Sequence, residues 1–562
     1  MTEQFPNADT GDELVFLPLG GSGEIGMNLN LYGYGPPDDR WWVMIDCGIT
    51  FGDERLPGVD VILPDPSFIE ERKDRLLGIV LTHAHEDHLG AVHYLWPRLD
   101  CPVYATPFTA NVLKEKLAEA QLLDEVPLHV IPLGSRFTLG PFDLELVTLT
   151  HSIPEPNAVA VRTALGTVMH TGDWKIDPDP MLGDDIDETR LRAIGDETVR
   201  AIVCDSTNVF SPGVSGSEAE VAKNLVEVID GCEGRVAVTT FASNVARVAS
   251  IAKAAVACDR QPVLAGRAMH KLVRAAQDAG YLKDFPSIVS EEDASYLPRE
   301  KALIICTGSQ GEPRAALARM VADSHPNISL DAGDTVIFSS RIIPGNEIGI
   351  FEMQNKLAER GIRVITEKDH FVHVSGHPCR DELQAMYRWI RPELAIPVHG
   401  ETRHLAEHAD LARTLQVAEA IPGCNGEMIR IAPGRAQVVD EVVYGRLYRD
   451  GDVILPAGDV SVTERRRLSF AGVVFVSLAI DSSGAVRGDI DIRLMGVPEE
   501  DEEGNSFEDL VFDAIDEVLD RIPRAKRGSP EALAEQLRRS VRGALRRTWG
   551  KKPQVEVVVT LV

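Results

Sequence analysis

The chain has 562 residues, of which 44% are hydrophobic and 26% are charged, and its formal net charge is −30. This length predicts two or three domains, and the composition is that of a globular protein rather than a disordered or fibrous one. The negative charge argues against broad, non-specific binding of nucleic acid, which needs clustered Lys and Arg, although bound divalent cations can supply positive charge locally.

The amino-terminal region and the cysteines both predict a cytoplasmic protein. The stretch MTEQFPNADTGDELVFLPLG contains acidic residues where a secretory signal would be basic. No apolar run approaches the roughly 20 residues that span a bilayer, so we expect neither export nor association with a membrane. The eight cysteines form no CxxC pair, which argues against a zinc ribbon or a dithiol redox site. Reduced thiols, mostly buried, are the simplest interpretation.

Predicted strands of the chain repeatedly end at residues of the types that bind metals. The strand pattern at 77–82 is followed by HAHEDH, and the pattern at 143–150 by His151. The patterns at 166–171, 199–204 and 393–398 are followed closely by Asp173, Asp205 and His399. Because α/β architectures place their chemistry at the carboxyl ends of strands, we expect these side chains to converge on one crevice.

The stretch HAHEDH is the strongest single signal in the sequence. His83 and His85 can converge from an extended backbone, and Asp87 and His88 lead into a helix, so that one short loop can supply two adjacent metal positions. Imidazole and carboxylate ligands without thiolate suit Zn²⁺, with Mn²⁺ or Mg²⁺ as alternatives. A polar loop with coincidental histidines is the alternative interpretation, and the HxHxDH spacing directly after a strand argues against it.

Between residue 206 and about residue 360, helix and strand patterns alternate. Examples are the helix pattern at 217–232 and the strand patterns at 301–308 and 335–340. This βαβ rhythm predicts a second parallel sheet.

A third unit is predicted after about residue 460. Strand patterns at 471–480, 489–497 and 554–562 surround two helical segments, which predicts a small α+β domain. The second helical segment, at 531–549, is basic and amphipathic. We favour a packed helix with a solvated charged face over a helix that contacts RNA.

In chain order, the metal-type residues resemble the motifs of the metallo-β-lactamase superfamily. The resemblance implies an αββα sandwich whose two divalent cations activate a hydroxide between them. It assigns His83, His85 and His151 to one metal, Asp87, His88 and His399 to the other, and Asp173 to a bridge between the two. Asp46 in VMIDCG matches an aspartate that braces the ligand loop without binding metal.

The long stretch between Asp173 and His399 resembles the domain inserted in the β-CASP group of nucleases. Asp205 in CDSTN and His377 in HVSGH match further motifs of that group, and His399 is typical of its RNA-processing branch. The resemblance implies that Asp205 orients groups around the metals. It also implies that His377 is the general acid, or stabilises the transition state, at the leaving 3′ oxygen. A purely structural His377 is the alternative.

Within this group, nearly the whole chain resembles the RNase J family, through LGGSGEIGMN, PGVD, TFASNVARV, TGSQGEPRAAL and IPGNE. The resemblance implies 5′→3′ hydrolysis of single-stranded RNA in RNA maturation and decay. It implies a preference for 5′-monophosphate ends, and it leaves open endonucleolytic cutting as a second mode. A homodimer or homotetramer formed through the carboxy-terminal domain, and proteins of an RNA-decay complex, are the other partners it implies.

The expected domain order follows from this resemblance. We expect residues 1–205 to form the first part of the metallo-β-lactamase domain, residues 206–365 the inserted β-CASP domain, and residues 366–455 the second part of the first domain. Residues 456–562 would form a linker and the carboxy-terminal α+β domain.

Two segments are expected to bind RNA phosphate. The first, HVSGH, comprises His373, Val374, Ser375, Gly376 and His377. There, an imidazole, a hydroxyl and a backbone N–H would bind the 5′ phosphate. The second is the polar turn formed by Ser309, Gln310 and Gly311, for which a simple turn is an equal alternative.

Two further residues carry weaker expectations. Arg341 stands where the family has a Ser-Pro-like sequence, and we favour surface charge over a phosphate contact. Asp450 in YRDGD is a candidate ligand of a separate Ca²⁺ site that some family members carry.

Three other classes of protein compete with a ribonuclease. A small-molecule metallohydrolase, such as a thioesterase or lactonase, would keep HAHEDH but lack the long insertion and HVSGH. A catalytically silent RNA-binding or scaffold subunit would have lost metal ligands, and this chain retains all of them. A DNA nuclease with the same chemistry is opposed by His399 and by the carboxy-terminal domain.

Overall fold

The computed structural model describes residues 11–527 and 529–562, and this part of the chain forms two compact units. The larger unit joins the residues up to Thr50 with Leu63–Arg446, and the smaller joins Phe51–Ile62 with Leu447–Val562. Part of the amino-terminal stretch on which the expectation about export rests lies outside the described residues. Within them, no helix is long and apolar enough to cross a membrane, and all eight cysteines are free.

Two β-sheets face each other in the larger unit. The first contains, in spatial order, β24 (Gln437–Glu441), β23 (Glu427–Ala432), β1 (Glu13–Gly20), β3 (Leu29–Gly35), β4 (Trp41–Ile45), β7 (Leu76–Val80), β8 (Val103–Ala105) and β9 (Leu128–Val130). The second contains β10 (Arg136–Leu139), β11 (Phe142–Thr148), β12 (Asn157–Thr163), β13 (Gly166–His170), β14 (Val199–Asp205), β20 (Leu394–Val398) and β22 (Glu419–Ala420). Apolar side chains from both sheets, among them Phe16, Val43, Leu144 and Ile396, share one core.

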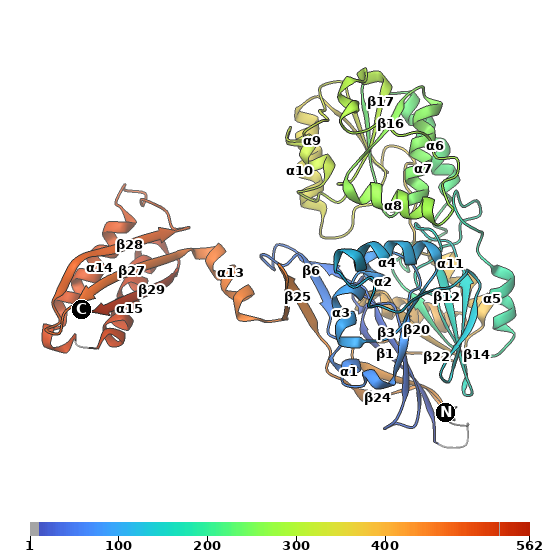
Figure 1. Ribbon diagram of the computed structural model, residues 1–562, viewed down its shortest axis with the longest axis horizontal. Helices are drawn as coiled ribbons and strands as arrows, with labels where there is room; N and C mark the ends of the chain where they lie inside the picture. The colour runs from blue at the N-terminus through green and yellow to red at the C-terminus, as the bar shows by residue number, and fades with distance from the viewer. Residues whose placement is uncertain (1–10, 528) are drawn as a thin grey trace. The chain divides into compact units, whose positions relative to one another are not determined.

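Helices cover the outer faces of these two sheets (Figure 1). On the side of the first sheet lie α1 (Ser67–Glu70), α2 (Glu86–Leu89), α3 (Val92–Leu99) and α4 (Pro107–Glu119), of which α4 contacts β8 and β9. On the side of the second sheet lie α5 (Glu188–Gly195), α11 (Arg380–Ile390) and α12 (Thr402–Thr414), which bury Leu191, Leu383 and Leu411 against its outer face. This layer order confirms the predicted αββα sandwich.

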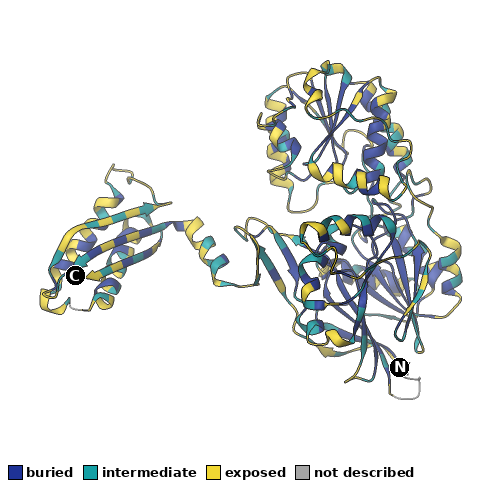
Figure 2. Ribbon diagram, viewed as in Figure 1, coloured by how far each residue is buried: buried dark blue, intermediate teal, exposed yellow. Residues whose placement is uncertain are grey.

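The inserted domain has a parallel sheet of its own, as the βαβ rhythm predicted. Its strands are, in spatial order, β16 (Gln261–Ala265), β17 (Ala302–Cys306), β15 (Val236–Thr239), β18 (Thr335–Phe338) and β19 (Arg363–Ile365), and every pairing is parallel. Its helices are α6 (Glu218–Asp230), α7 (Val245–Ala257), α8 (Arg267–Asp278), α9 (Ala316–Val321) and α10 (Glu347–Glu359). Figure 2 shows these strands buried between helices whose outer faces are exposed. Strands buried on both faces explain the nearly continuous apolar runs in the sequence.

The smaller unit contains the predicted α+β domain. Its sheet has the order β28 (Val486–Met495), β27 (Val473–Ile480) and β29 (Gln554–Leu561), and α14 (Phe507–Arg521) and α15 (Pro530–Trp549) share a core with it. The unit begins earlier than the expected residue 456 and includes residues 51–62. The reason is a sheet in which β26 (Val453–Pro456) and β25 (Arg446–Asp450) lie beside β6 (Val61–Pro64) and β5 (Thr50–Phe51), followed by α13 (Val460–Ala471). Pairing between segments so distant in sequence leaves no local pattern.

The strand directions explain why one edge of the sandwich collects the polar residues. β13, β14 and β20 are mutually parallel neighbours, with His170 opposite Val203 and Asp205 opposite Val398. Their carboxyl ends therefore meet at the same edge of the second sheet, and Asp173, Asp205 and His399 follow there. This is the arrangement by which open α/β sheets build a crevice for a ligand.

Candidate functional site

Three imidazoles from two loops point their nitrogen atoms at one position. His83 Nε2 and His151 Nε2 each lie 3.1 Å from His85 Nδ1. Asp173 Oδ2 lies 3.9 Å from His83 Nε2 and 3.8 Å from His151 Nε2. These four residues form one group whose ligand atoms all lie within 4.8 Å of one another.

A second group adjoins the first and shares Asp173 with it. His88 Nε2 lies 3.1 Å from Asp173 Oδ2, and His399 Nε2 lies 3.1 Å from Asp87 Oδ2. The ligand atoms of Asp87, His88, Asp173 and His399 again lie within 4.8 Å of one another. The structure thus brings together all seven residues proposed as metal ligands, and Asp173 occupies the shared position expected for a bridge.

The chemistry of these side chains fits divalent cations. Burial, together with neighbouring imidazoles, holds the pKa of His83 and His151 well below its usual range, so that their lone pairs are free to coordinate. Burial alone would raise the pKa of the Asp173 carboxyl, but the imidazoles of His399 and His88 outweigh this effect and hold the pKa well below its usual range, which keeps the group ionised. Asp173 Oδ1 is buried and has no hydrogen-bond partner among the described residues. A buried carboxylate oxygen without a partner fits a cation ligand.

The His88 ring nitrogen that faces away from the site contacts a buried carboxylate. His88 Nδ1 lies 2.7 Å from Asp46 Oδ2, and Asp46 accepts hydrogen bonds from the backbone N–H and the hydroxyl of Thr82, both at 2.8 Å. Such a carboxylate–histidine pair fixes the tautomer and the orientation of a metal-ligating ring. Asp46 has a φ of 65° and His399 a φ of 51°, in the left-handed region that non-glycine residues rarely adopt. Strain of this kind is typical of functional sites.

Asp205 and His377 form a pair beside the second group. His377 Nδ1 lies 2.8 Å from Asp205 Oδ2 and 3.8 Å from Asp173 Oδ2. Burial lowers the pKa of His377, but the charges of Asp205 and Asp173 raise it more, and the net shift is upward. His377, Asp205, Asp173 and His399 also lie close enough to share a cation. His377 is therefore placed either to carry a proton or to bind a metal.

The HVSGH segment contacts His151 of the first ligand group. The carbonyl of Gly376 lies 2.5 Å from Nδ1 of His151, and a Cβ at this glycine would lie 2.7 Å from the His151 ring. His373 is half-buried, its Nδ1 is buried without a partner among the described residues, and burial holds its pKa well below the usual range. The Ser375 hydroxyl accepts a hydrogen bond from Asn208 at 2.7 Å, and Val374 is buried.

The polar turn at 309–311 is held within the inserted domain. The Gln310 side chain accepts a hydrogen bond from the backbone N–H of Ile343 at 2.9 Å and donates one to the carbonyl of Arg341 at 2.9 Å. Ser309 is buried, and Gly311 has a φ of 79°. These contacts give the turn a structural role of its own. The Arg341 side chain is exposed, and its charge contributes to the low pKa of His373, so that it lies near the HVSGH segment.

Asp450 does not lie in a cluster of ligand-type residues. Its carboxylate forms an ion pair with Arg465, and the groups of ligand-type side chains found in the described residues do not include it. A carboxylate paired with a guanidinium is a poor start for a calcium site, and we do not propose one there.

Several residues without an assigned role from the sequence also shape the site. Asn28 Nδ2 lies 3.1 Å from His88 Nε2, and the Thr207 hydroxyl lies 2.8 Å from His399 Nδ1. Asn208 donates to the carbonyl of His377 at 3.0 Å as well as to Ser375. The polar run CDSTN directly after a buried strand was the available signal for Thr207 and Asn208.

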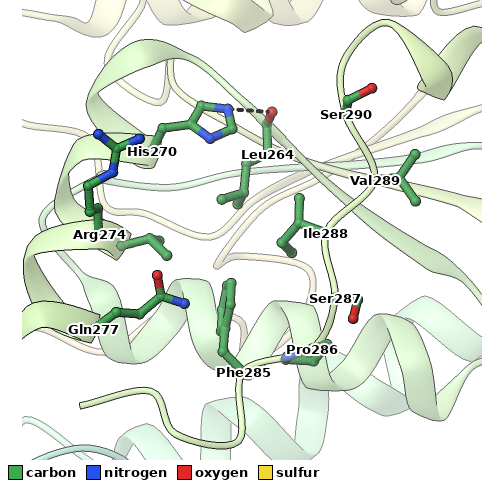
Figure 3. Close-up of a pocket in the computed structure, with 11 residues that line it drawn as sticks. Leu264, His270, Arg274, Gln277, Phe285, Pro286, Ser287, Ile288, Val289 and Ser290 are labelled. Atoms are coloured by element: carbon green, nitrogen blue, oxygen red, sulfur yellow. Dashed lines mark hydrogen bonds between the residues drawn. The ribbon is translucent and has the colours of Figure 1, made fainter. Parts of the chain in front are cut away.

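A pocket of about 510 Å³ lies in the inserted domain (Figure 3). It lies between α8 and the segment 285–290, and Leu264, Val273, Phe285 and Ile288 make much of its lining apolar. None of the residues that line it belongs to the ligand groups or to HVSGH. The pocket is therefore distinct from the ligand groups at the strand ends of the sandwich.

The fold and the paired ligand groups define a metal-dependent hydrolase of the metallo-β-lactamase superfamily with a β-CASP insertion. Four known domain families match the chain: the Beta-lactamase superfamily domain at 41–194, the Ribonuclease J beta-CASP domain at 233–357, the Zn-dependent metallo-hydrolase RNA specificity domain at 361–421 and the Ribonuclease J C-terminal domain at 460–562. The chain is also 50% identical over 551 residues to Ribonuclease J of Sinorhizobium meliloti, covering 98% of both chains. It belongs to the Ribonuclease J family.

More distant relatives match over most of the chain. The chain is 37% identical over 542 residues to Ribonuclease J of Mycolicibacterium smegmatis, with 96% of this chain and 95% of the relative covered. It is 36% identical over 478 residues to Ribonuclease J of Thermus thermophilus, with 83% and 82% covered. A solved structure of a protein of unknown function from Enterococcus faecalis matches 74% of this chain and 100% of its own, with a TM-score of 0.51 and 16% identity. That last similarity concerns the fold alone.

Proposed function

We propose that this chain is a cytoplasmic ribonuclease that degrades single-stranded RNA in the 5′→3′ direction, prefers 5′-monophosphate ends and retains endonucleolytic cutting as a second mode. The observation that carries the proposal is the contact between HVSGH and the first ligand group, in which the Gly376 carbonyl lies 2.5 Å from His151 Nδ1. A terminal phosphate bound by this segment would place the following phosphodiester beside the metals. The names of the relatives support RNA as the substrate.

In this proposal seven side chains hold two divalent cations, of which Zn²⁺ is favoured and Mn²⁺ or Mg²⁺ are alternatives. When bound, such cations lower the pKa of water and neutralise charge on the attacked phosphate. Asp46 orients the ring of His88, and Asp205 orients His377. His377 donates a proton to the leaving 3′ oxygen, for which the raised pKa of its imidazole is suitable.

HVSGH offers only a few groups that can bind phosphate, which favours a monophosphate at the 5′ end. A neutral His373 imidazole, the Ser375 hydroxyl and the backbone N–H of Gly376 would together bind one phosphate. These three groups lie within four consecutive residues, and Gly376 contacts a metal ligand, so the phosphate would be bound directly ahead of the metals. A triphosphate would add bulk and charge at this point.

Cleavage assays with different 5′ ends test this proposal. We expect 5′-monophosphorylated RNA to be degraded to mononucleotides faster than the same RNA with a 5′-triphosphate, and we expect single-stranded DNA to be a poor substrate. A chelator should stop all cleavage. The products should be resolved on a sequencing gel with label at either end. Equal rates for the two RNAs would contradict the end preference, and faster cleavage of DNA would favour a DNA nuclease.

Two other functions receive less support. A thioesterase or lactonase would not need a β-CASP domain, which the family match places at 233–357. A silent subunit is disfavoured because all seven proposed ligand residues are present and their ligand atoms converge. Activity on RNA in the assay above would exclude both.

We also propose that the carboxy-terminal domain joins copies of the chain into a dimer or tetramer, on which RNA-decay proteins could assemble. Alternate residues of β27 are buried against α14 and α15, which leaves Phe475 of the opposite face 44% exposed. Val558 of the neighbouring β29 is 58% exposed. Apolar side chains on an open sheet face support an interface between subunits.

Removal of the residues after 459 should therefore lower the oligomeric state. The full chain and the truncated chain should be compared by light scattering coupled to size-exclusion chromatography, with circular dichroism as the control for folding. A truncated protein that is folded and has the same number of subunits would contradict the proposed interface.

A further inference from the structure

A fully buried arginine of the inserted domain holds the backbone directly before HVSGH. Arg247, in α7, is 0% exposed, and its Nη1 donates a hydrogen bond to the carbonyl of Val372 at 3.1 Å. The same nitrogen donates to the hydroxyl of Ser339 at 2.8 Å. His373, which the proposed function places on the 5′ phosphate, is the next residue after Val372. The guanidinium is therefore one peptide unit away from the proposed phosphate site.

Ser339 adds a second hydrogen bond to the same carbonyl. Its hydroxyl is buried and donates to the carbonyl of Val372 at 2.7 Å. Val372 is itself 0% exposed, so its carbonyl oxygen has no access to water and depends on these two donors. Two donors on one buried acceptor fix both the position and the rotation of the peptide that leads into His373.

The opposite side of Arg247 is held by a chain of buried charges. Its Nε and Nη2 each donate to the Glu218 carboxylate at 2.8 Å, in a bidentate pair. The backbone N–H of Glu218 donates to Asp177 at 3.0 Å, and Asp177 lies 2.8 Å from the ammonium of Lys175. Lys175 is 0% exposed and follows the bridging Asp173 by two residues. This chain connects the metal-ligand loop to the segment before HVSGH.

The buried pair between Arg247 and Glu218 is not needed for stability alone. A buried ion pair is often no more stabilising than apolar residues of the same volume, because both charges lose their hydration. Its advantage is geometric, since a planar guanidinium can satisfy a carboxylate on one edge and a carbonyl on the other. Arg247 donates from Nε and Nη2 to Glu218 and from Nη1 to the carbonyl of Val372.

We propose that Arg247 and Ser339 are positioning residues that set the preference for 5′-monophosphorylated RNA by fixing the peptide between Val372 and His373. The inference rests on the proposed function, because it assumes that HVSGH binds the terminal phosphate. No hydrogen bond among the described residues joins either side chain directly to a proposed metal ligand, so we expect bound metal to be retained when either is replaced. Replacement of either residue should leave the cleavage of RNA without a 5′ phosphate unchanged.

The first test is Ser339→Ala, which removes one donor and adds no volume. With 5′-monophosphorylated RNA we expect KM to rise about three- to tenfold, on the scale of one lost hydrogen bond, while kcat is retained. With 5′-hydroxyl RNA neither constant should change. Ser250→Ala is the matched control, since Ser250 is a buried serine in α7 of the same domain whose hydroxyl has no hydrogen-bond partner among the described residues.

The second test is Arg247→Lys, which keeps a positive charge beside Glu218 but cannot span both partners. The KM for 5′-monophosphorylated RNA should rise further than in Ser339→Ala, and metal content should stay unchanged. Arg260→Lys is its control, because Arg260 is also buried and donates to backbone carbonyls, those of Gly234 and Cys232, elsewhere in the domain. If Arg247→Lys fails to fold, Ser339→Ala decides.

Binding measured in the presence of a chelator gives a readout that does not depend on cleavage. Fluorescence anisotropy should show that Ser339→Ala weakens binding of 5′-phosphorylated RNA and leaves binding of 5′-hydroxyl RNA unchanged. Equal losses for the two RNAs would indicate a purely structural role and overturn the inference. A wild-type preference that both variants retain would also overturn it, while leaving the proposed function intact. A wild-type protein with no preference would overturn both.

Discussion

Replacement of Asp87 or His83 with Ala is expected to abolish RNA cleavage while RNA binding persists. His83 lies in the first group of ligand atoms and Asp87 in the second, and the two groups share Asp173. Removal of either side chain leaves an incomplete ligand set, and catalysis by paired cations needs both of them in place. Phosphate contacts by HVSGH would remain, because neither residue belongs to that segment.

Three measurements on the same preparations check this prediction. Elemental analysis should show a loss of bound metal in both variants, gel assays should show no product, and anisotropy should show an RNA affinity close to that of the wild type. His129→Ala is the matched control, since His129 is an exposed histidine on β9, at the edge of the first sheet. Residual cleavage above a few per cent would contradict the assignment of these residues as ligands.

The second large effect is expected at His377. Replacement with Ala should lower turnover by about 10²–10⁴-fold, the usual contribution of a general acid, while metal content stays unchanged. The reason is that His377 contacts Asp205 at 2.8 Å and has a raised pKa, as a proton donor requires. A loss of metal in His377→Ala would instead identify His377 as a ligand, consistent with its place in the third group of ligand atoms.

The pH dependence of Asp205→Asn separates these two roles further. The charge of Asp205 raises the pKa of His377, so the neutral amide should lower it. A general acid must be protonated, and its activity is lost as pH rises through its pKa. The alkaline limb of kcat should therefore move to lower pH in Asp205→Asn. An alkaline limb that does not move would argue against His377 as the proton donor.

The sequence by itself determined the candidate residues of the site, through the ends of apolar strands and the resemblance to known motifs. His83 and His85 follow the apolar strand β7 and His151 follows β11. Asp173 and His399 follow β13 and β20, whose parallel order with β14 brings their carboxyl ends to one edge. A strand end is a local feature, so the candidate residues could be predicted from the sequence. The meeting of the loop after β7 with the ends of β13 and β20 depends on the packing of two different sheets. The parallel sheet of the inserted domain was predictable for the same reason, since its helix and strand periods are local as well.

Only the tertiary structure decided which partners the remaining polar residues have. Gln310 braces the segment at 341–343, Asp450 pairs with Arg465, residues 51–62 belong to the smaller unit, and Arg247 reaches Val372. The physical reason is that a hydrogen bond or ion pair depends on which surfaces pack together. The partners lie between 15 positions (Asp450 and Arg465) and 125 positions (Arg247 and Val372) apart, and the helix and strand periods of the sequence carry no trace of that packing.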